Sequence, residues 1–350
     1  MSERHLPAEW SPQDGIMLTW PHSHGDWAPW LVQVDRVYSQ IVKAVSAYEK
    51  LLIVCYDRQH QSHIEKILHP QGVDLSQLLL HIVRSNDSWA RDHGPITVLE
   101  NTAPKLLDFD FNGWGGKYPS ALDDRINQSL YSQKAFTDID IEAWPLILEG
   151  GSIDSDGQGT LLTTEQCLLT PSRNPQLNKL EVEAILKTSL GIERILWLSK
   201  GELIGDDTDS HIDMLARFCD VNTIAYSSCE DESDPHYLPL KEMAAELVAF
   251  KTAEGKPYKL VALPIPKPVH NRDGQRLPAS YANFLIINQA VLLPVYDDEM
   301  DEIATQRLAG CFPDRKIIGI DCRPLIEQFG SLHCITMQLP KGVLRSQLVI

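Results

Sequence analysis

Apolar and polar positions alternate along the chain in blocks that predict short strands separated by helices. Residues 30–50 carry apolar side chains at helical spacing, and the apolar runs at 51–56 and 78–84 are typical of buried strands. Two apolar runs at 284–288 and 291–295 are joined by a short polar turn and predict a hairpin. This mixture of hairpins and helices favours an α+β fold or a repeated ββαβ unit over a doubly wound sheet.

The same alternation continues through the rest of the chain. Further strand-like runs lie at 105–111, 146–148, 160–169, 194–198, 223–226, 259–264, 316–321 and 334–339. Helical patterns lie at 60–68, 174–189, 238–251 and 298–309. Neither a clean linker nor a low-complexity segment interrupts them, so we expect residues 1–350 to form a single domain.

Composition and charge narrow the class of protein. The 350 residues are 43% hydrophobic and include 31 Lys+Arg against 48 Asp+Glu, a formal net charge of −17. Such a chain repels nucleic acid and anionic membranes and attracts small cations, although the charge also serves solubility. The sequence has no long apolar run and no apolar signal segment, and its seven cysteines include no C-x-x-C pair. We therefore expect a cytoplasmic protein without a disulfide framework or zinc knuckle.

Two polar clusters follow predicted strands. In Trp89-Ala90-Arg91-Asp92, an extended turn would present an aromatic face and a carboxylate to one space, which suits a planar cation. A structural Arg-Asp pair beneath a tryptophan is the alternative. In Glu149-Gly150-Gly151-Ser152, two glycines after a carboxylate allow another backbone to approach closely, although a simple turn has the same pattern.

Two further clusters carry the groups needed for covalent chemistry. Strand alternation would place His211 and Asp213 on one side, as a base and a cation binder, as two metal ligands or as a solvated polar pair. Cys334 lies where a Gly-Ser turn enters a strand, and is either an inert core thiol or a nucleophile. A thiol, a histidine and carboxylates together favour covalent catalysis, and the wide spacing of these ligands disfavours a metal site.

Together these clusters resemble the agmatine deiminase family and its relatives, the bacterial peptidylarginine deiminases. The resemblance runs nearly end to end through motifs in the expected order. The motifs are Pro7-Ala8-Glu9-Trp10, Trp20-Pro21-His22, Asn86-Asp87-Ser88-Trp89 with Arg91-Asp92 and Gly94-Pro95, Glu149-Gly150-Gly151-Ser152, His211-Ile212-Asp213, Ser280-Tyr281 with Asn283-Phe284, Gly319-Ile320, and His333-Cys334-Ile335-Thr336 with Gln338.

The resemblance implies a fold and a role for each cluster. The fold would be a five-bladed propeller of ββαβ units (pentein-type), with pseudo-fivefold symmetry around a central active site. Cys334 would be the nucleophile, His211 the general acid/base, and Glu149 the carboxylate that hydrogen-bonds and orients His211. The residues expected to hold the substrate are Asp92 and Asp213 on its guanidinium nitrogens, Trp89 against its planar group, and Asn283 in support.

The implied activity is hydrolysis of agmatine to N-carbamoylputrescine and ammonia, in putrescine biosynthesis, by a cytoplasmic homodimer without metal or organic cofactor. The alternative within the family is a citrulline-forming deiminase of arginine or peptidyl-arginine, whose substrate carboxylate or backbone would need a basic clamp at the pocket mouth. Candidates for that clamp are Arg173, Arg217, Arg272, Arg276 and Arg323. A guanidinium-binding module, an amidinotransferase and a metal-dependent hydrolase are further alternatives.

Two stretches depart from the family pattern and bear on substrate choice. Ser210 stands where the family usually has a glycine, and Phe329-Gly330-Ser331-Leu332 replaces a Gly-Gly-Asn-like approach to the cysteine. The second stretch is expected to border the far end of the substrate. The sequence leaves the resting protonation state of Cys334 open, because carboxylates oppose the thiolate while a bound cation and a protonated histidine favour it.

Overall fold

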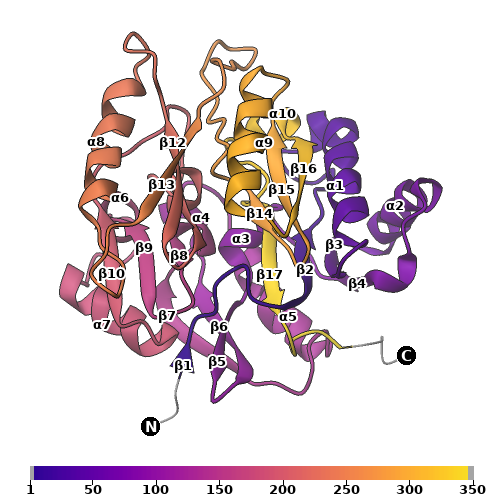
Figure 1. Ribbon diagram of the computed structural model, residues 1–350. Helices are drawn as coiled ribbons and strands as arrows, with labels where there is room; N and C mark the ends of the chain where they lie inside the picture. Colours follow the sequence, from indigo (N-terminus) through magenta and orange to yellow (C-terminus); the bar gives the residue numbers. More distant parts are fainter. Residues whose placement is uncertain (1–3, 346–350) are drawn as a thin grey trace.

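The strands of the protein form five separate sheets of three or four strands, with helices packed between and around them (Figure 1). The structure is a computed structural model that describes residues 4–345. Each sheet contains an antiparallel pair followed by a parallel strand. Three sheets are each built from one continuous segment, a fourth adds a short N-terminal strand to such a segment, and the fifth combines strands from both ends of the chain. The expected ββαβ unit is therefore present five times in an α/β fold.

The four continuous units share one order: two antiparallel strands, one or two helices, and a strand parallel to the second. Their elements are β5 (Ile96–Glu100), β6 (Ala103–Asp110), α4 (Gly113–Gly116), α5 (Ile126–Ser132) and β7 (Ile141–Ile147); β8 (Ile153–Ser155), β9 (Thr160–Thr164), α6 (Glu165–Leu168), α7 (Lys179–Leu190) and β10 (Arg194–Leu198); β11 (Ala216–Asp220), β12 (Thr223–Ser228), α8 (Tyr237–Ala249) and β13 (Lys259–Pro264); and β14 (Leu285–Ile286), β15 (Ala290–Val295), α9 (Met300–Cys311) and β16 (Lys316–Asp321). A short strand, β1 (Arg4–His5), extends the first of these sheets beside β5.

The fifth unit closes the structure by joining the two ends of the chain. Strand β17 (Thr336–Pro340) runs antiparallel to β2 (Gln13–Thr19), and the two lie side by side in the centre of Figure 1. Its other elements are α1 (Leu31–Val45), β3 (Lys50–Cys55), α2 (Arg58–Leu68) and β4 (Leu78–Ile82). Two short helices, α3 (Ala90–His93) and α10 (Arg323–Ile326), lie in connecting segments. None of the helices in residues 4–345 has both the length and the apolar character needed to cross a membrane.

The hydrophobic patterns explain how the central sheet is buried. Along β2, Ile16 and Leu18 belong to one hydrophobic cluster while Met17, between them, belongs to a second. Successive strand side chains point to opposite faces, so each face of this sheet is covered by a different core. Continuous apolar runs such as the one at 51–55 are typical of strands buried on both faces. The hairpin predicted at 284–295 is confirmed by the antiparallel pairing of β14 with β15.

Two local predictions were wrong. Residues 211–213 form a short 3-10 helix and its N-cap instead of a strand, because Asp209 and Ser210 both adopt φ of 65° and turn the chain. Trp89 and Asp92 lie in and just before the single helical turn α3 instead of an extended turn. In both places the polar side chains still point inward, because tertiary packing outweighs the local period in such short segments.

Candidate active site

The side chains expected to carry chemistry come from equivalent places in the five units. Each lies a few residues before the first strand of an antiparallel pair. The pairs are Asp92 before β5, Glu149 before β8, Asp213 before β11, Asn283 before β14 and Cys334 before β17. The structure thus brings together segments that are far apart in the sequence. For example, Arg91, next to Asp92, donates to the backbone oxygen of His333, next to Cys334, 242 positions away.

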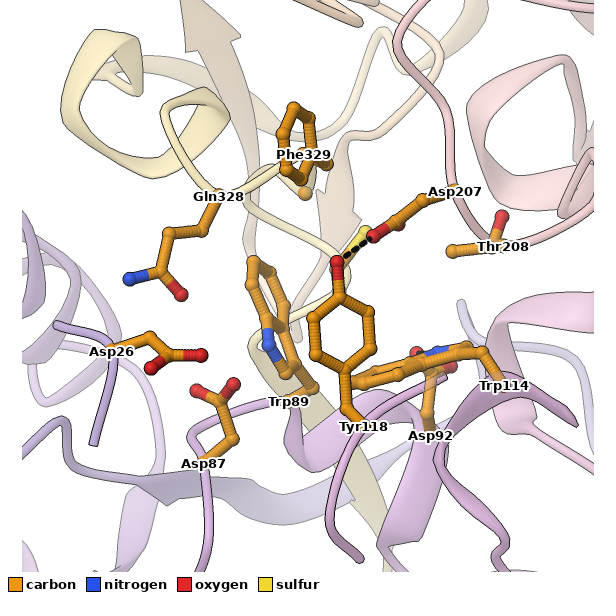
Figure 2. Close-up of a pocket in the computed structure, with 12 residues that line it drawn as sticks. Asp26, Asp87, Trp89, Asp92, Trp114, Tyr118, Asp207, Thr208, Gln328 and Phe329 are labelled. Atoms are coloured by element: carbon orange, nitrogen blue, oxygen red, sulfur yellow. Dashed lines mark hydrogen bonds between the residues drawn. The ribbon is translucent and has the colours of Figure 1, made fainter. Parts of the chain in front are cut away.

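Cys334 belongs to the lining of a pocket of about 200 Å³. The lining includes four aromatic side chains and four aspartates (Figure 2). The lining residues are Asp26, Asp87, Trp89, Asp92, Trp114, Tyr118, Asp207, Thr208, Gln328, Phe329, Gly330 and Cys334. Figure 2 shows Asp26 and Asp87 together on one side, with the hydrogen bond from Tyr118 to Asp207 crossing the other. No lysine or arginine belongs to this lining within the part of the chain that the structure describes.

Cys334 lies at the base of the pocket with 5% of its surface exposed. The side-chain amide of Asn283 donates a hydrogen bond to Cys334 Sγ over 3.3 Å, and its oxygen accepts one from the backbone N–H of His333 at 2.8 Å. Asp213 Oδ2 lies 3.9 Å from Sγ. Burial, followed by the charges of Asp213 and Asp92, raises the pKa of the Cys334 thiol well above its usual value. In the absence of substrate the sulfur is therefore a neutral thiol.

Asp213 has one oxygen committed and one free. Its Oδ2 accepts a hydrogen bond from His333 Nδ1 over 2.8 Å, whereas the buried Oδ1 has no partner. An unpaired carboxylate oxygen away from water is costly unless a ligand satisfies it. The site therefore presents a ready acceptor beside Cys334.

Asp92 supplies a second carboxylate to the same space. It accepts hydrogen bonds from the backbone N–H of Gly151 at 3.1 Å and from Trp114 Nε1 at 2.9 Å. Burial raises the pKa of Asp92 to about 6, although the neighbouring His211 opposes that shift. A Cβ on Gly151 would lie 2.6 Å from His211 Nδ1 and 2.8 Å from Asp92 Oδ1. The second glycine of this motif is therefore required for the close approach of these functional groups.

His211 is buried, and neither of its ring nitrogens has a hydrogen-bond partner among the described residues, although the thiol of Cys167 lies nearby. Its Nδ1 lies 3.7 Å from Asp92 Oδ1. Burial disfavours the charged ring, but the negative charge of Asp92 and other neighbours outweighs it and raises the pKa of His211 well above its usual value. His211 thus holds a proton and has free ring nitrogens that face acidic groups.

Glu149 lies beside His211 but is engaged elsewhere. Both of its oxygens accept hydrogen bonds from Arg173 Nε, at 2.8 and 2.9 Å, and both side chains are fully buried. The second arm of Arg173 donates to Asp209 Oδ2 at 2.7 Å. The hydrogen bond expected between Glu149 and His211 is consequently absent from this structure, since neither ring nitrogen has a partner.

The five arginines considered as a basic clamp lie away from the pocket lining. Arg173 and Arg217 are buried in ion pairs beneath the site. Arg272 stacks on Trp30, and Arg276 and Arg323 pair with aspartates. The clamp prediction fails because each guanidinium already has a local partner.

Trp89 and the loop before Cys334 form one wall together. Phe329 has φ of 65°, and the following Gly330 lies so close to Trp89 that a Cβ there would be 2.1 Å from a ring atom. Trp89 also contacts Trp114 edge-on, with ring centroids 6.4 Å apart. The loop that departs from the family pattern thus borders the pocket and packs against the tryptophan ring.

Several lining residues were missed by the sequence analysis. Trp114, which donates to Asp92, lies between glycines and has φ of 55°, so Gly-Trp-Gly-Gly was its only local signal. Tyr118 and Asp207 come from loops without periodicity, and their pairing over 2.8 Å links segments 89 positions apart. Nothing in the neighbouring sequence indicates that contact.

Glu149, Cys167 and His211 form the one group of metal-ligating side chains found within residues 4–345, with ligand atoms within 4.8 Å of one another. Arg173 already occupies both oxygens of Glu149. A metal ion there would meet the adjacent guanidinium charge without a free carboxylate to offset it. These residues therefore fit a metal poorly.

Comparison with known proteins agrees with this geometry. Residues 5–340 match the model of the Porphyromonas-type peptidyl-arginine deiminase family. A Vibrio parahaemolyticus protein named "Putative agmatine deiminase" is 36% identical over 96% of each chain. The fold matches a Porphyromonas gingivalis structure described as a "Putative Arginine Deiminase" with a TM-score of 0.92 at 45% identity, covering 98% of this chain and 100% of that one. It also matches a cysteine-to-serine variant of C. jejuni agmatine deiminase with substrate bound, with a TM-score of 0.90 at 41% identity over 98% of each chain. The chain belongs to the Porphyromonas-type peptidyl-arginine deiminase family.

Proposed function

We propose that the protein hydrolyses agmatine to N-carbamoylputrescine and ammonia through a covalent cysteine intermediate. The observation that carries this proposal is a pocket lined by Cys334 and Asp92, in which the charged lining residues are all aspartates within the described part of the chain. Asp213 Oδ2 lies 3.9 Å from the sulfur of Cys334. The relatives whose printed names include agmatine deiminase support the same reaction. It is a hydrolysis at a C–N bond of a linear amidine.

The base of the pocket suits a guanidinium group. A guanidinium ion is planar, stays protonated at physiological pH and is a poor electrophile. Asp213 Oδ1 and the carboxylate of Asp92 would accept its N–H donors, while the ring of Trp89 packs against its plane. Held in this way, the central carbon faces Cys334 Sγ.

The reaction then proceeds in two halves. The Cys334 thiolate adds to the guanidinium carbon, and His211 gives its proton to the departing nitrogen, which leaves as ammonia and breaks the C–N bond. An amidino-thioether on Cys334 remains. His211 next takes a proton from water, and the hydroxide adds to the same carbon. The C–S bond then breaks to return the thiolate, and the added hydroxyl loses its proton to solvent, which leaves the neutral ureido product. Positioned acid/base catalysis of this kind contributes about 10²–10⁴-fold.

Substrate binding supplies the charge that activates the thiol. With Asp92 and Asp213 unopposed by a cation, the pKa of Cys334 is held well above its usual value by burial and by these charges. A bound guanidinium neutralises the carboxylates and favours the thiolate, so Cys334 loses its proton as the substrate enters. Asn283 donates to the sulfur in either state and supports the nucleophile.

The charges at the mouth select the far end of the substrate. Agmatine ends in an ammonium group, whereas arginine carries an additional carboxylate. Asp26, Asp87 and Asp207 line the mouth and would attract the ammonium and repel the carboxylate. Acidic side chains therefore favour agmatine over arginine and over a peptide that ends in arginine.

Ammonia release from agmatine, arginine and a C-terminal arginyl peptide tests the proposed substrate. We expect agmatine to have the highest kcat/KM of the three, with both carboxylate-bearing compounds turned over far more slowly. A higher kcat/KM for arginine or the peptide would keep the chemistry and replace the substrate. Absence of ammonia from all three would overturn the proposed function.

The acid limb of the pH profile follows from Asp92. Its pKa is raised to about 6 by burial, and only the ionised carboxylate grips a guanidinium. We therefore expect kcat/KM for agmatine to fall as pH drops through about 6, reaching roughly a tenfold loss at one unit below. In kcat the limb should lie at lower pH, because the bound cation favours ionised Asp92.

A variant separates Asp92 from a neighbour with a similar pKa. Burial also raises the pKa of Asp87, at the mouth, to about 6. The acid limb should persist in Asp87→Asn even where KM changes. A limb that disappears in this variant, or a flat wild-type profile down to pH 5, would contradict the role of Asp92.

The larger architecture completes the proposal. The five ββαβ units, each supplying one side chain to the site, are arranged as a five-bladed propeller with pseudo-fivefold symmetry, and residues 1–350 form one catalytic domain. The repeated strand order and the equivalent positions of the site residues support this arrangement. The enzyme acts in the cytoplasm as a homodimer and needs neither metal nor organic cofactor. Ammonia release that is unaffected by chelators would support the last point.

A further inference from the structure

A buried chain of contacts lies beneath Asp213, the carboxylate proposed to bind the substrate. His333, next to the nucleophile, is 2.8 Å from Asp213 Oδ2 through Nδ1 and 2.6 Å from Glu9 Oε2 through Nε2. Glu9 comes from the Pro-Ala-Glu-Trp motif near the N-terminus, 324 positions away. All three side chains are at least 95% buried. No step of the proposed reaction uses Glu9 or His333.

The contacts fix the imidazole ring at both of its nitrogens. An ionised carboxylate accepts hydrogen bonds, and each ring nitrogen of His333 lies within hydrogen-bond distance of one carboxylate oxygen. Burial opposes ionisation of Glu9, but Arg217 and His333 outweigh it and lower its pKa, and His333 lowers the pKa of Asp213 in the same way. The ring of His333 is thus held between two carboxylates.

Two buried arginines share this network of carboxylates. Glu9 also accepts from Arg217 Nη2 at 2.9 Å and lies 3.6 Å from Arg91 Nη2. Asp154 pairs with Arg217 Nε at 3.2 Å. The arginines thus lie against Glu9 and Asp154, and His333 is the partner of Asp213 Oδ2. Loss of one partner from such a buried network leaves a charge unpaired away from water, which is strongly unfavourable.

This arrangement controls how Asp213 faces the substrate. His333 holds Oδ2, which lies 3.9 Å from Cys334 Sγ, and Oδ1 is left without a partner among the described residues. The anchor is rigid because Glu9 in turn accepts the backbone N–H of Ile286 at 2.7 Å and the guanidinium of Arg217. A preoriented acceptor avoids the cost of reorganisation when the guanidinium binds.

We propose that Glu9 and His333 are positioning residues for substrate recognition, which hold Asp213 in the orientation that binds the guanidinium. This inference rests on the proposed function for the identity of the substrate. It assigns the N-terminal motif a role at the active site that a purely structural ion pair would lack.

Agmatine binding to the Cys334→Ala protein, with and without His333→Gln, tests the proposal by calorimetry at a temperature where both are folded. Glutamine retains one amide donor but not the second contact. Since hydrogen bonds to charged groups are worth about 1.5–3 kcal/mol, we expect agmatine affinity to fall about 10- to 100-fold. In the otherwise wild-type protein, the loss should appear mainly in KM. Glu9→Gln should cause a smaller loss in the same direction.

His81→Gln is the matched control. His81, on the edge strand β4, is also a buried histidine, but its hydrogen-bond partner is Gln133. It should leave agmatine affinity unchanged. A His333→Gln protein that unfolds more easily yet binds agmatine with wild-type affinity would reduce His333 to a structural role and overturn the proposal.

Hydrogen bonding of the His333 ring provides a readout that needs neither catalysis nor a foldable variant. Nitrogen NMR of the wild-type protein labelled in histidine should show both ring nitrogens of His333 in hydrogen bonds. A ring nitrogen of His333 without a hydrogen bond would overturn the proposal whatever the variants do. If no guanidine releases ammonia but both ring nitrogens of His333 are hydrogen-bonded and its variant loses guanidinium binding, the proposed reaction fails while the positioning role stands.

Discussion

Turnover of agmatine is expected to fall by about 10⁴-fold or more when Cys334 is replaced by alanine, because the covalent step has no substitute nucleophile. Agmatine affinity should change little, since in the proposed complex Asp92, Asp213 and Trp89 bind the guanidinium. Ammonia release and calorimetric binding measured on the same preparation check both halves. Mass spectrometry should detect the trapped amidino adduct in the wild type. The adduct should be absent from Cys334→Ala.

Cys55→Ala serves as the control for removing a buried thiol. Cys55 is fully buried at the end of β3 and does not line the pocket. Its replacement should cost stability through lost packing but leave kcat and KM close to wild type. Substantial ammonia release by Cys334→Ala, or equal losses in the two variants, would exclude covalent catalysis by Cys334.

Replacing Arg173 by methionine is expected to lower the free energy of unfolding by about 3–5 kcal/mol, because it leaves Glu149 as an unpaired charge away from water. Both side chains of this ion pair have 0% exposure, and the pair spans 2.8 Å. Activity should fall too. The ligand atoms of Glu149, Cys167 and His211 lie within 4.8 Å of one another, so an unpaired Glu149 would attract the imidazole ring of His211 and shift it. Urea denaturation followed by tryptophan fluorescence measures the stability.

Arg323→Met is the matched control for Arg173→Met. Arg323 also pairs with two aspartates, but its side chain is 46% exposed and those of Asp321 and Asp297 are 40% and 76% exposed. Water screens such pairs, so its loss should cost about 0–1 kcal/mol. Similar losses in the two variants would mean that the buried pair does not hold Glu149. Adding Glu149→Gln to Arg173→Met should recover part of the stability, because it removes the stranded charge.

Many of the residues gathered at the site could be found in the sequence because they lie in short contiguous motifs. Asp92, Glu149, Asp213, Asn283 and Cys334 all lie in segments that end one strand-helix unit and begin the next. Polar residues and glycines concentrate there, against apolar strands on either side, so they stand out in the sequence. The hairpin at 284–295 was predictable for the same reason, since its partners are neighbours in the chain.

The sequence alone determined the alternation of hairpins and helices, the acidic charge and the order of the polar motifs, because these depend on local composition and spacing. The tertiary structure decided which partners those residues have. In the folded chain Glu149 pairs with Arg173, and Trp114 donates to Asp92. His333 bridges Glu9 and Asp213, which lie far apart in the sequence. Buried charges take the partner that lies nearest in space, and that proximity depends on how separate units pack, which no local pattern records.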